Sequence, residues 1–429
     1  MMSYKKKVLI ITYYWPPAGG SGVQRWLKFS KYLRGFEIEP VIYTIDNPSY
    51  PILDKSLESE IPKDLEILKQ AIFEPNSMLS FFGRNNKKES AGFLNPNPTF
   101  FGSIIQYIRA NYFIPDARKF WIQPSVNFLS NYLENNHIDA IITTGPPHSM
   151  HLIGLELKKK LGIKWISDFR DPWTEIDYFQ QLPLTKKATK KHQDLEQEVL
   201  INSDMVAVVG ETMKEKFLQH TKRIEVLTNG FDTIEDLSTQ KLDEKFSITH
   251  VGLMNSDRNP TILWEVLNEI SNTNLNFKND LRIKLIGKLD DAVIQDLKIF
   301  DHNTIETIPY LDHKDVSKYQ ASSQVLLLSI NEVPSAKGII TGKIFEYLQA
   351  KRPILAIGPE DGDAAMILKN TNAGTIVGFK NKTALKATIL NLYKDYKEGV
   401  LFVKSVNIEQ YHRKNITSQL AEVIKKVVS

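Results

Sequence analysis

Residues 8–25 read VLIITYYWPPAGGSGVQR, an apolar run that leads into a loop of prolines and glycines. The pattern predicts a buried strand over 8–12, a turn, and a helix over 23–33. Further short apolar runs alternate with helical segments and lie at 40–44, 140–143, 164–167 and 205–209. Because such strands are apolar on both faces, they are typical of a parallel sheet that helices cover on both sides.

The same alternation starts again after Asn229-Gly230. The second set of predicted strands lies at 246–251, 281–286, 325–329 and 353–357. The polar stretch 233–244 is interpreted as a linker. The segment 407–428 is expected to form a helix with one apolar face, made by Ile416, Leu420, Ile424 and Val427.

The chain has 429 residues, a length that agrees with two or three domains. We predict an α/β protein with two Rossmann-like lobes at 1–232 and 245–405. The first lobe carries an irregular insertion near 47–132, which includes the loop signal Asn95-Pro96-Asn97-Pro98. The chain then ends in a helical segment at 406–429.

The composition excludes several classes of function. The chain has no cysteine, which rules out a disulfide scaffold, a thiolate zinc site and a cysteine nucleophile. A net charge of +4 over this length is no nucleic-acid signature. No apolar run approaches the ~18 residues that a membrane span needs, and Pro16-Pro17 interrupt the apolar stretch that would resemble a signal peptide. We therefore expect a cytoplasmic protein without nucleic-acid partners.

The loop after the first predicted strand is a candidate binding site. Gly20 and Gly22 would let a ligand approach the backbone, and the helix that follows would offer N–H groups to an anion. A dinucleotide site is the alternative, with Asp46 as the ribose-binding acid. However, Arg25 stands where the dinucleotide fingerprint needs its third glycine. Gly20, Gly22 and Arg25 are thus predicted to line a ligand site.

Two further strand ends in the first lobe carry polar side chains. Asp168, Arg170 and Asp171 follow the strand at 164–167, at the sheet edge where α/β proteins bind ligands. They are predicted to point at sugar hydroxyls or at an acceptor, and an internal salt bridge that fixes the loop is the alternative. His148 follows another strand end and is either a cleft residue or a surface histidine. With His151 it lacks the third ligand of a zinc site.

In the second lobe, a loop of glycine, threonine and lysine opens a predicted helix. Thr341, Gly342 and Lys343 at the helix start suit a diphosphate, and Glu346 one turn later suits ribose hydroxyls. A helix cap with an exposed acid is the alternative. Gly252 would admit a ligand at the end of the strand at 246–251, and Arg258 is predicted to contact the same diphosphate.

An aromatic and basic stretch lies at 107–121 within the insertion. Helical packing against the first lobe is one interpretation. The other is a surface that touches membrane lipid or a lipid-linked acceptor, which would place the protein peripherally on the cytoplasmic membrane. A nearby run of basic residues would assist such contact: Lys186, Lys187, Lys190 and Lys191.

Five segments together carry a family resemblance. They are PPAGGSG at 16–22, DFRDPW at 168–173, LTNGFD at 227–232, the glycine loop with Arg258-Asn259, and KIFEYLQAKRP at 343–353. In their order and spacing they resemble the retaining nucleotide-sugar glycosyltransferases of GT-B fold, of the large family-four type. The resemblance covers nearly the whole chain. It implies two Rossmann-like lobes facing a cleft and a last helix that crosses back to the N-terminal lobe.

The resemblance also implies a reaction. A sugar would pass from a nucleotide-diphosphate donor, bound mainly by the C-terminal lobe, to a cell-surface polysaccharide or glycolipid acceptor, bound mainly by the N-terminal lobe. No metal or further cofactor is expected. Glu346 matches the second of the family's two donor-site glutamates, whereas Gly338 stands at the first, and Leu253 replaces an arginine of the phosphate loop. A nucleotide-sugar epimerase, a glycogen-synthase relative and a catalytically silent nucleotide-sugar-binding partner remain alternatives.

Overall fold

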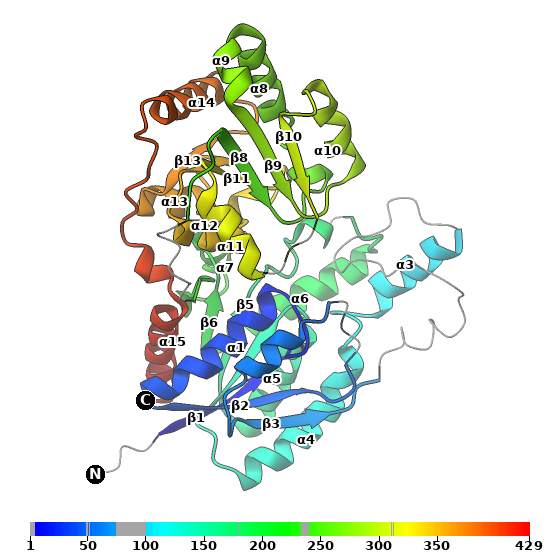
Figure 1. The fold of residues 1–429 in the computed structure, drawn as a ribbon. Helices are drawn as coiled ribbons and strands as arrows, with labels where there is room; N and C mark the ends of the chain where they lie inside the picture. Colours follow the sequence, from blue (N-terminus) through cyan, green and yellow to red (C-terminus); the bar gives the residue numbers. More distant parts are fainter. Residues whose placement is uncertain are drawn as a thin grey trace. The chain divides into compact units, whose positions relative to one another are not determined.

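The structure is a computed structural model that describes residues 5–429 except 49, 51, 74–99, 180, 233–239, 310 and 312. The chain divides into two compact units (Figure 1). Unit 1 comprises Met1–Asn229 and Arg413–Ser429, and unit 2 comprises Gly230–His412. The loop at 95–98 and most of the linker at 233–244 lie outside the described residues.

Unit 1 is built on a seven-stranded parallel sheet with the order β3-β2-β1-β4-β5-β6-β7. The strands are β1 Lys6–Ile11, β2 Ile38–Ile45, β3 Glu66–Gln70, β4 Ala140–Gly145, β5 Lys164–Phe169, β6 Met205–Val208 and β7 Ile224–Val226. The direction in which strands are added reverses between β1 and β4. In α/β sheets, ligands bind at the carboxyl ends of the strands beside such a reversal.

Helices cover both faces of the unit 1 sheet. The helices of unit 1 are α1 Ser21–Leu33, α3 Phe100–Tyr112, α4 Ile122–Asn135, α5 Ser149–Leu161, α6 Lys186–Asn202, α7 Glu211–Phe217 and α15 Arg413–Val428. Successive side chains of β1 point to opposite faces of the sheet and pack in two different hydrophobic cores. Val8 and Ile10 belong to a core with residues of α1 and α15, whereas Leu9 and Ile11 belong to a core with Trp121.

The C-terminal helix belongs to unit 1, as predicted. Figure 1 shows that α15 lies beside α1, although the two helices are at opposite ends of the sequence. The four apolar residues foreseen on one face of this helix are all buried in the core below: Ile416, Leu420, Ile424 and Val427. The last 17 residues therefore complete the hydrophobic core of the first unit.

Unit 2 repeats the architecture with a six-stranded parallel sheet of order β10-β9-β8-β11-β12-β13. The strands are β8 Phe246–Val251, β9 Leu281–Ile286, β10 Ile305–Ile308, β11 Val325–Ser329, β12 Ile354–Ile357 and β13 Gly374–Val377. The helices are α8 Thr261–Thr273, α9 Leu275–Asp280, α10 Asp291–Asp296, α11 His313–Ser322, α12 Gly342–Ala350, α13 Asp363–Thr371 and α14 Lys382–Lys397. Here the strand order reverses between β8 and β11.

Short 3₁₀ helices connect several of these elements: η1 Arg34–Phe36, η2 Lys55–Glu60, η3 Lys119–Trp121, η4 Asp177–Phe179, η5 Ser256–Arg258, η6 Leu297–Ile299, η7 Ala336–Gly338 and η8 Ile408–Tyr411. The predicted α/β class with two Rossmann-like units is confirmed. None of the helices described is both long and apolar enough to cross a lipid bilayer.

Candidate active site

In unit 2 the candidate residues gather at the carboxyl end of β8, beside the reversal of strand order. β8 pairs with β9 as far as Val251, but its pairing with β11 ends at Thr249. Beyond that point a side chain bridges the two strands. The Tyr347 hydroxyl accepts a hydrogen bond from the Val251 amide (3.1 Å) and donates one to the Leu327 carbonyl (3.3 Å). The two strands thus separate where a ligand is expected to enter.

Two glycines follow the neighbouring strands β8 and β9. Gly252 and Gly287 have φ angles of 99° and 116°, which favour glycine. A Cβ atom at Gly252 would lie 2.8 Å from Cε of Lys343, and one at Gly287 would lie 2.9 Å from the Gly252 carbonyl oxygen. The close approach predicted at Gly252 is therefore made by a side chain of the protein itself.

Lys343 extends from the first turn of α12 to the end of β8. Its Nζ lies 3.1 Å from Nε2 of His250 and 3.4 Å from the Leu253 carbonyl oxygen. Burial and the nearby positive charge of Arg258 lower the pKa of Lys343 to about 7. Neither hydrogen-bond partner is an anion, so the amine can still accept a negatively charged ligand.

Arg258 lies in η5, on the loop after β8. Its Nε donates a hydrogen bond to Oδ1 of Asn331, just beyond β11 (2.5 Å), and Ser329 bonds its backbone carbonyl (2.7 Å). Burial lowers the pKa of this guanidinium, and its charge in turn lowers the pKa of Lys343. The two cations predicted for a diphosphate are thus near enough to repel each other.

The first turn of α12 supplies further groups. Thr341 is the N-cap residue, and its hydroxyl is buried with no hydrogen-bond partner in the described part of the chain. Gly342 faces open space, since nothing lies within 4 Å of where its Cβ would be. Glu346, one turn further, accepts a hydrogen bond from Nε2 of Gln320 (3.2 Å). The first N–H groups of a helix favour an anion, so this turn is suited to phosphate.

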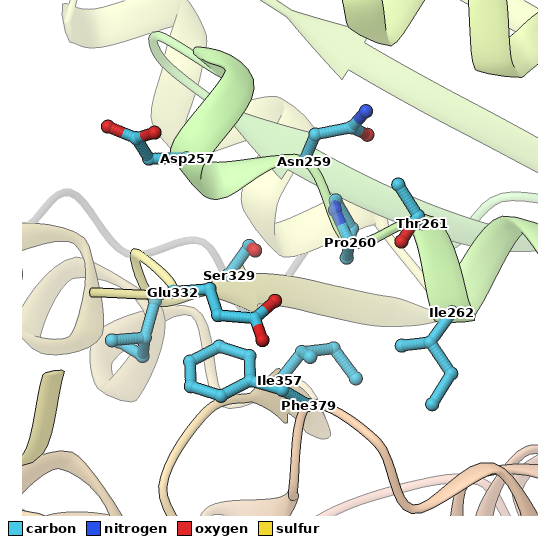
Figure 2. Close-up of a pocket in the computed structure, with 10 residues that line it drawn as sticks. Asp257, Asn259, Pro260, Thr261, Ile262, Ser329, Glu332, Ile357 and Phe379 are labelled. Atoms are coloured by element: carbon cyan, nitrogen blue, oxygen red, sulfur yellow. The ribbon is translucent and has the colours of Figure 1, made fainter. Parts of the chain in front are cut away.

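A small pocket opens at the ends of β11, β12 and β13 (Figure 2). Its lining is mixed, and it includes the polar residues Asp257, Asn259, Ser329 and Glu332 beside the ring of Phe379. Neither Lys343 nor Glu346 lines it. The pocket adjoins the loop that carries Arg258, because Asp257 and Asn259 line it and Ser329 donates to the Arg258 carbonyl.

In unit 1, Arg25 and Asp168 form a buried ion pair. Nη2 of Arg25 lies 2.7 Å from Asp168 Oδ1, and both side chains are 2% exposed. Trp26 and Thr144 also donate to this carboxylate, each at 2.8 Å. Burial alone would raise the pKa of Asp168, but the charge of Arg25 and these hydrogen bonds lower it.

This pair requires a correction to the predicted site. Arg25 was expected to face a ligand, but its guanidinium also donates to the carbonyls of Leu227 (2.7 Å) and Thr228 (2.9 Å). Asp168 is likewise enclosed, because three side chains occupy its two oxygens. Asp168 thus forms an internal salt bridge, the alternative considered for its segment, and its partner is Arg25 of α1. They connect α1, β5 and the segment that follows β7.

Arg170 has a different environment. Its amide donates to the Gly145 carbonyl (3.0 Å), and its guanidinium contacts the Pro146 carbonyl. A Cβ atom at Gly22 would lie 1.7 Å from Nη1 of Arg170, so the glycine loop is packed against this guanidinium. The Nε of Arg170 is buried without a hydrogen-bond partner among the described residues. Gly20, with φ at 104°, gives the loop the conformation from which α1 starts.

His148 lies at the start of α5 and is 5% exposed. Its ring stacks on Trp173 at 4.8 Å between centroids, and both ring nitrogens are buried without a partner in the described part of the chain. Burial and the neighbouring His151 and Arg170 lower the pKa of His148 well below its usual value. His148 is therefore a neutral imidazole with unused hydrogen-bonding capacity.

Asp171 follows Arg170 and remains accessible. The surrounding protein raises the pKa of this carboxyl, and the charge of Arg170 opposes the rise. The structure thus brings Gly22, Arg170, Asp171 and His148 to one strand-end region of unit 1. The enclosed pair Arg25 and Asp168 lies next to them, since the charges of both residues act on Arg170.

Comparison with known proteins identifies the fold. No family model matches the sequence, and no curated protein matches it. Among solved structures, sucrose-phosphate synthase from Thermosynechococcus elongatus is 12% identical, covers 98% of both chains and has a TM-score of 0.62. HepE from Anabaena, in complex with UDP-glucose, is 12% identical over 98% of this chain and 99% of its own, with a TM-score of 0.59.

A Listeria monocytogenes protein described as a UDP-N-acetylglucosamine 2-epimerase is also similar, at 13% identity and a TM-score of 0.55, over 98% of this chain and 96% of its own. With both units matched over nearly their full length, the chain has the GT-B fold. At these identities the likeness defines the fold and leaves the reaction open.

Several residues of the two sites were not foreseen. His250 and Tyr347 complete the strand end in unit 2, and Trp173 and Gly145 complete the surroundings of His148 in unit 1. A Cβ at Gly145 would lie 2.6 Å from Nε2 of His151 and 3.0 Å from Nδ1 of His148, so this position must be small. The signal for Gly145 was present in the sequence, since it follows a strand directly. A histidine inside a predicted strand, such as His250, carries no such signal.

Proposed function

We propose that the protein is a glycosyltransferase that uses a nucleotide-diphosphate sugar as donor. The observation that carries the proposal is the group of side chains at the end of β8. Lys343 and Arg258 form no ion pair with a carboxylate in the described part of the chain, and beside them α12 starts with the unpartnered hydroxyl of Thr341. Two cations and a helix N-terminus together are complementary to a diphosphate.

The roles of the donor-side residues follow from their chemistry. Lys343, Arg258 and the N–H groups at Gly342 would bind the two phosphates and stabilise the charge that develops on the leaving nucleoside diphosphate. Glu346 would accept hydrogen bonds from the ribose hydroxyls, in place of the one it accepts from Gln320. This stabilisation uses the protein's own charges, and we propose a retaining transfer that needs no metal or further cofactor.

On unit 1 we propose that Arg170, Asp171 and His148 orient the acceptor. The unpartnered nitrogens of His148 and Arg170 support this role, because buried polar groups are normally satisfied. Gly20 and Gly22 keep the loop narrow beside Arg170. Arg25 and Asp168 are positioning residues that connect α1 to β5. The acceptor would be a saccharide, either a cell-surface polysaccharide or a lipid-linked glycan.

The surface of α3 supports an acceptor at a membrane. Unlike the core helices, α3 leaves five large apolar side chains between 42% and 66% exposed: Ile104, Ile105, Tyr107, Ile108 and Tyr112. Asn111 ties α3 to the start of α6, through bonds with Pro183 and Thr185. That start carries four exposed lysines, Lys186, Lys187, Lys190 and Lys191. Apolar side chains next to lysines are suited to an anionic lipid surface.

Two alternatives use the same fold. A nucleotide-sugar epimerase is favoured by the likeness to the Listeria protein, and a catalytically silent nucleotide-sugar-binding partner is favoured by Gly338, which stands in place of an acidic residue. Each makes a separable prediction. A transferase slowly hydrolyses its donor and speeds up with acceptor, an epimerase converts the donor sugar without releasing it, and a silent partner binds the donor unchanged.

The test begins with thermal stability in the presence of UDP-, GDP- and ADP-sugars. A ligand at 100 times its Kd stabilises the native state by about 2.7 kcal/mol, which gives a measurable shift in Tm. The best donor is then incubated without acceptor, and the products are analysed for free sugar, epimer and nucleoside diphosphate. The variant Lys343→Met serves as the matched control, since it removes the amine and keeps much of the side-chain shape. A donor that binds equally well to this variant would refute the proposed site.

A further inference from the structure

His250 is a buried polar residue for which the proposed roles give no use. It lies in β8, its side chain is fully buried, and its Nε2 is 3.1 Å from Nζ of Lys343. A lysine that binds phosphate needs no histidine behind it. The contact between His250 and Lys343 is therefore not explained by phosphate binding alone.

The protonation of His250 follows from its second nitrogen. Nδ1 lies 3.2 Å from the carbonyl oxygen of Leu327, and a carbonyl can only accept a hydrogen bond. Nδ1 must carry the proton, which leaves the Nε2 lone pair facing Lys343. Burial and the charge of Lys343 lower the pKa of His250 well below its usual value, so the ring stays neutral. Nε2 is thus a fixed acceptor for the Lys343 amine.

The amine has a second fixed neighbour. The Leu253 carbonyl lies 3.4 Å from Nζ, and the missing side chain at Gly252 provides the space for Cε and Nζ. Two acceptors and the backbone of Gly252 therefore set the direction of Nζ, away from bulk water and toward the end of β8. Such a position costs free energy for a charged amine, because burial disfavours the ammonium form.

The groups that face Lys343 are few. His250 faces it from β8, Arg258 from the loop after β8, and Glu346 from α12 itself. Arginine stays charged at every pH near neutrality, and the His250 ring stays neutral. Of Lys343, Arg258 and His250, only Lys343 therefore changes its charge between pH 7 and 8.5.

We propose that a nucleoside diphosphate binds at this site together with one proton, which is taken up by Nζ of Lys343, and that His250 is the positioning residue that holds Nζ for it. The inference rests on the proposed function, since it assumes a diphosphate beside Lys343. Before binding, the amine is partly neutral because it is buried next to Arg258. The phosphate charge then favours the ammonium, which donates to the phosphate while Nε2 of His250 still accepts from it.

Isothermal titration calorimetry tests the proton count. UDP, GDP and ADP are titrated into the full chain at pH 7.0 and 8.5, each in buffers of different ionisation enthalpy, and the best binder is carried forward. With an amine pKa of about 7, the expected uptake is about half a proton at pH 7.0 and close to one at pH 8.5. The Kd should rise about 15-fold over the same interval. The phosphate itself has a second pKa of about 6 and contributes little here.

Variants separate the positioning role from a structural one. His250→Leu removes the acceptor, so it should weaken binding at pH 7.0 about tenfold and move the midpoint of proton uptake to lower pH. His250→Gln keeps an acceptor oxygen and should restore most of the affinity, and Lys343→Met should abolish the uptake. The exposed His302 in the same unit gives the matched control, and His302→Gln should leave both readouts unchanged.

The outcomes are distinguishable. If none of the three nucleoside diphosphates binds, the proposed function fails and this inference fails with it. If one binds without proton uptake at pH 8.5, only the inference is overturned. If uptake is normal but His250→Leu and His250→Gln bind like the unmodified protein, the positioning role of His250 is refuted. Should the leucine variant not fold, the proton count and the glutamine variant still decide.

Discussion

The replacement Asp168→Asn tests whether the DFRDPW segment is held by an internal ion pair. In the native protein Asp168 Oδ1 faces Nη2 of Arg25, and Oδ2 accepts from Nε of Arg25 (3.3 Å), from Trp26 and from Thr144. An asparagine oxygen fits best at the Oδ2 position, where three donors converge. Its NH₂ group would then point at the Arg25 guanidinium, donor against donor. The variant leaves a buried cation without its counter-charge.

The expected loss follows from this geometry. Removing one partner of a buried ion pair typically costs about 3–5 kcal/mol. Arg25 keeps its bonds to the Leu227 and Thr228 carbonyls, so we expect the lower end, about 3 kcal/mol. For a unit of this size that is a fall in Tm of roughly 6–12 °C. Because the native pKa of Asp168 is lowered, its contribution is present above the unfolded pKa of about 3.9 and is lost as the pH falls further.

Differential scanning calorimetry at pH 7 and at pH 3 measures both effects. The matched control is Asp171→Asn, because Asp171 is accessible, lies three residues away and forms no hydrogen bond or ion pair within the described part of the chain. We expect a large fall in Tm for Asp168→Asn at pH 7, a smaller one at pH 3, and little change for the control. An Asp168→Asn protein that melts like the unmodified one, but has lost donor hydrolysis, would refute the structural role and return Asp168 to the catalytic group.

Three further results are expected. Glu346→Gln should raise the Kd for the nucleoside diphosphate roughly 10- to 100-fold with an unchanged circular dichroism spectrum, since a charged hydrogen-bond acceptor is lost; unchanged affinity would exclude Glu346 from the ribose site. Asp171→Asn should lower sugar transfer about tenfold or more with the donor Kd unchanged, because positioning contributes to the reaction step; full transfer would contradict the acceptor role. The double variant Ile105→Glu with Ile108→Glu should abolish cosedimentation with phosphatidylglycerol vesicles and leave donor hydrolysis intact. If the unmodified protein binds neutral vesicles as strongly as anionic ones, the lysines at the start of α6 do not contribute to membrane binding.

The sequence predicts the central strands of both sheets, and it misses the edges. The strands foreseen correspond to β1, β2, β4, β5 and β6 in unit 1 and to β8, β9, β11 and β12 in unit 2. The four strands that were missed are β3, β7, β10 and β13, which are the edge strands of the two sheets. Their side chains are only partly buried, so their sequences lack the continuous apolar run that marks a strand covered on both faces.

The residue types at the sites are predictable for a related reason. In a parallel sheet the strand direction fixes which end of each strand faces the ligand edge, so residues after an apolar run can be assigned to it from sequence alone. This rule pointed to Arg258 in unit 2 and to Arg170 and His148 in unit 1, whereas Thr341 and Lys343 were predicted from the glycine-containing start of a helix. Their proximity within each unit follows from the sheet order, which the alternation of strands and helices implies.

What the rule cannot give is the partner of each side chain. Asp168 and Asp171 are three residues apart, and both follow the strand predicted at 164–167. One is enclosed by Arg25, Trp26 and Thr144, and the other is accessible. The difference arises because Asp168 still belongs to β5 and its side chain points into the layer beneath α1, whereas Asp171 lies beyond the strand. In the same way Lys343 meets His250 only because the pairing of β8 with β11 stops at Thr249. Such contacts join residues 93 and 143 positions apart, and a local pattern carries no information about them.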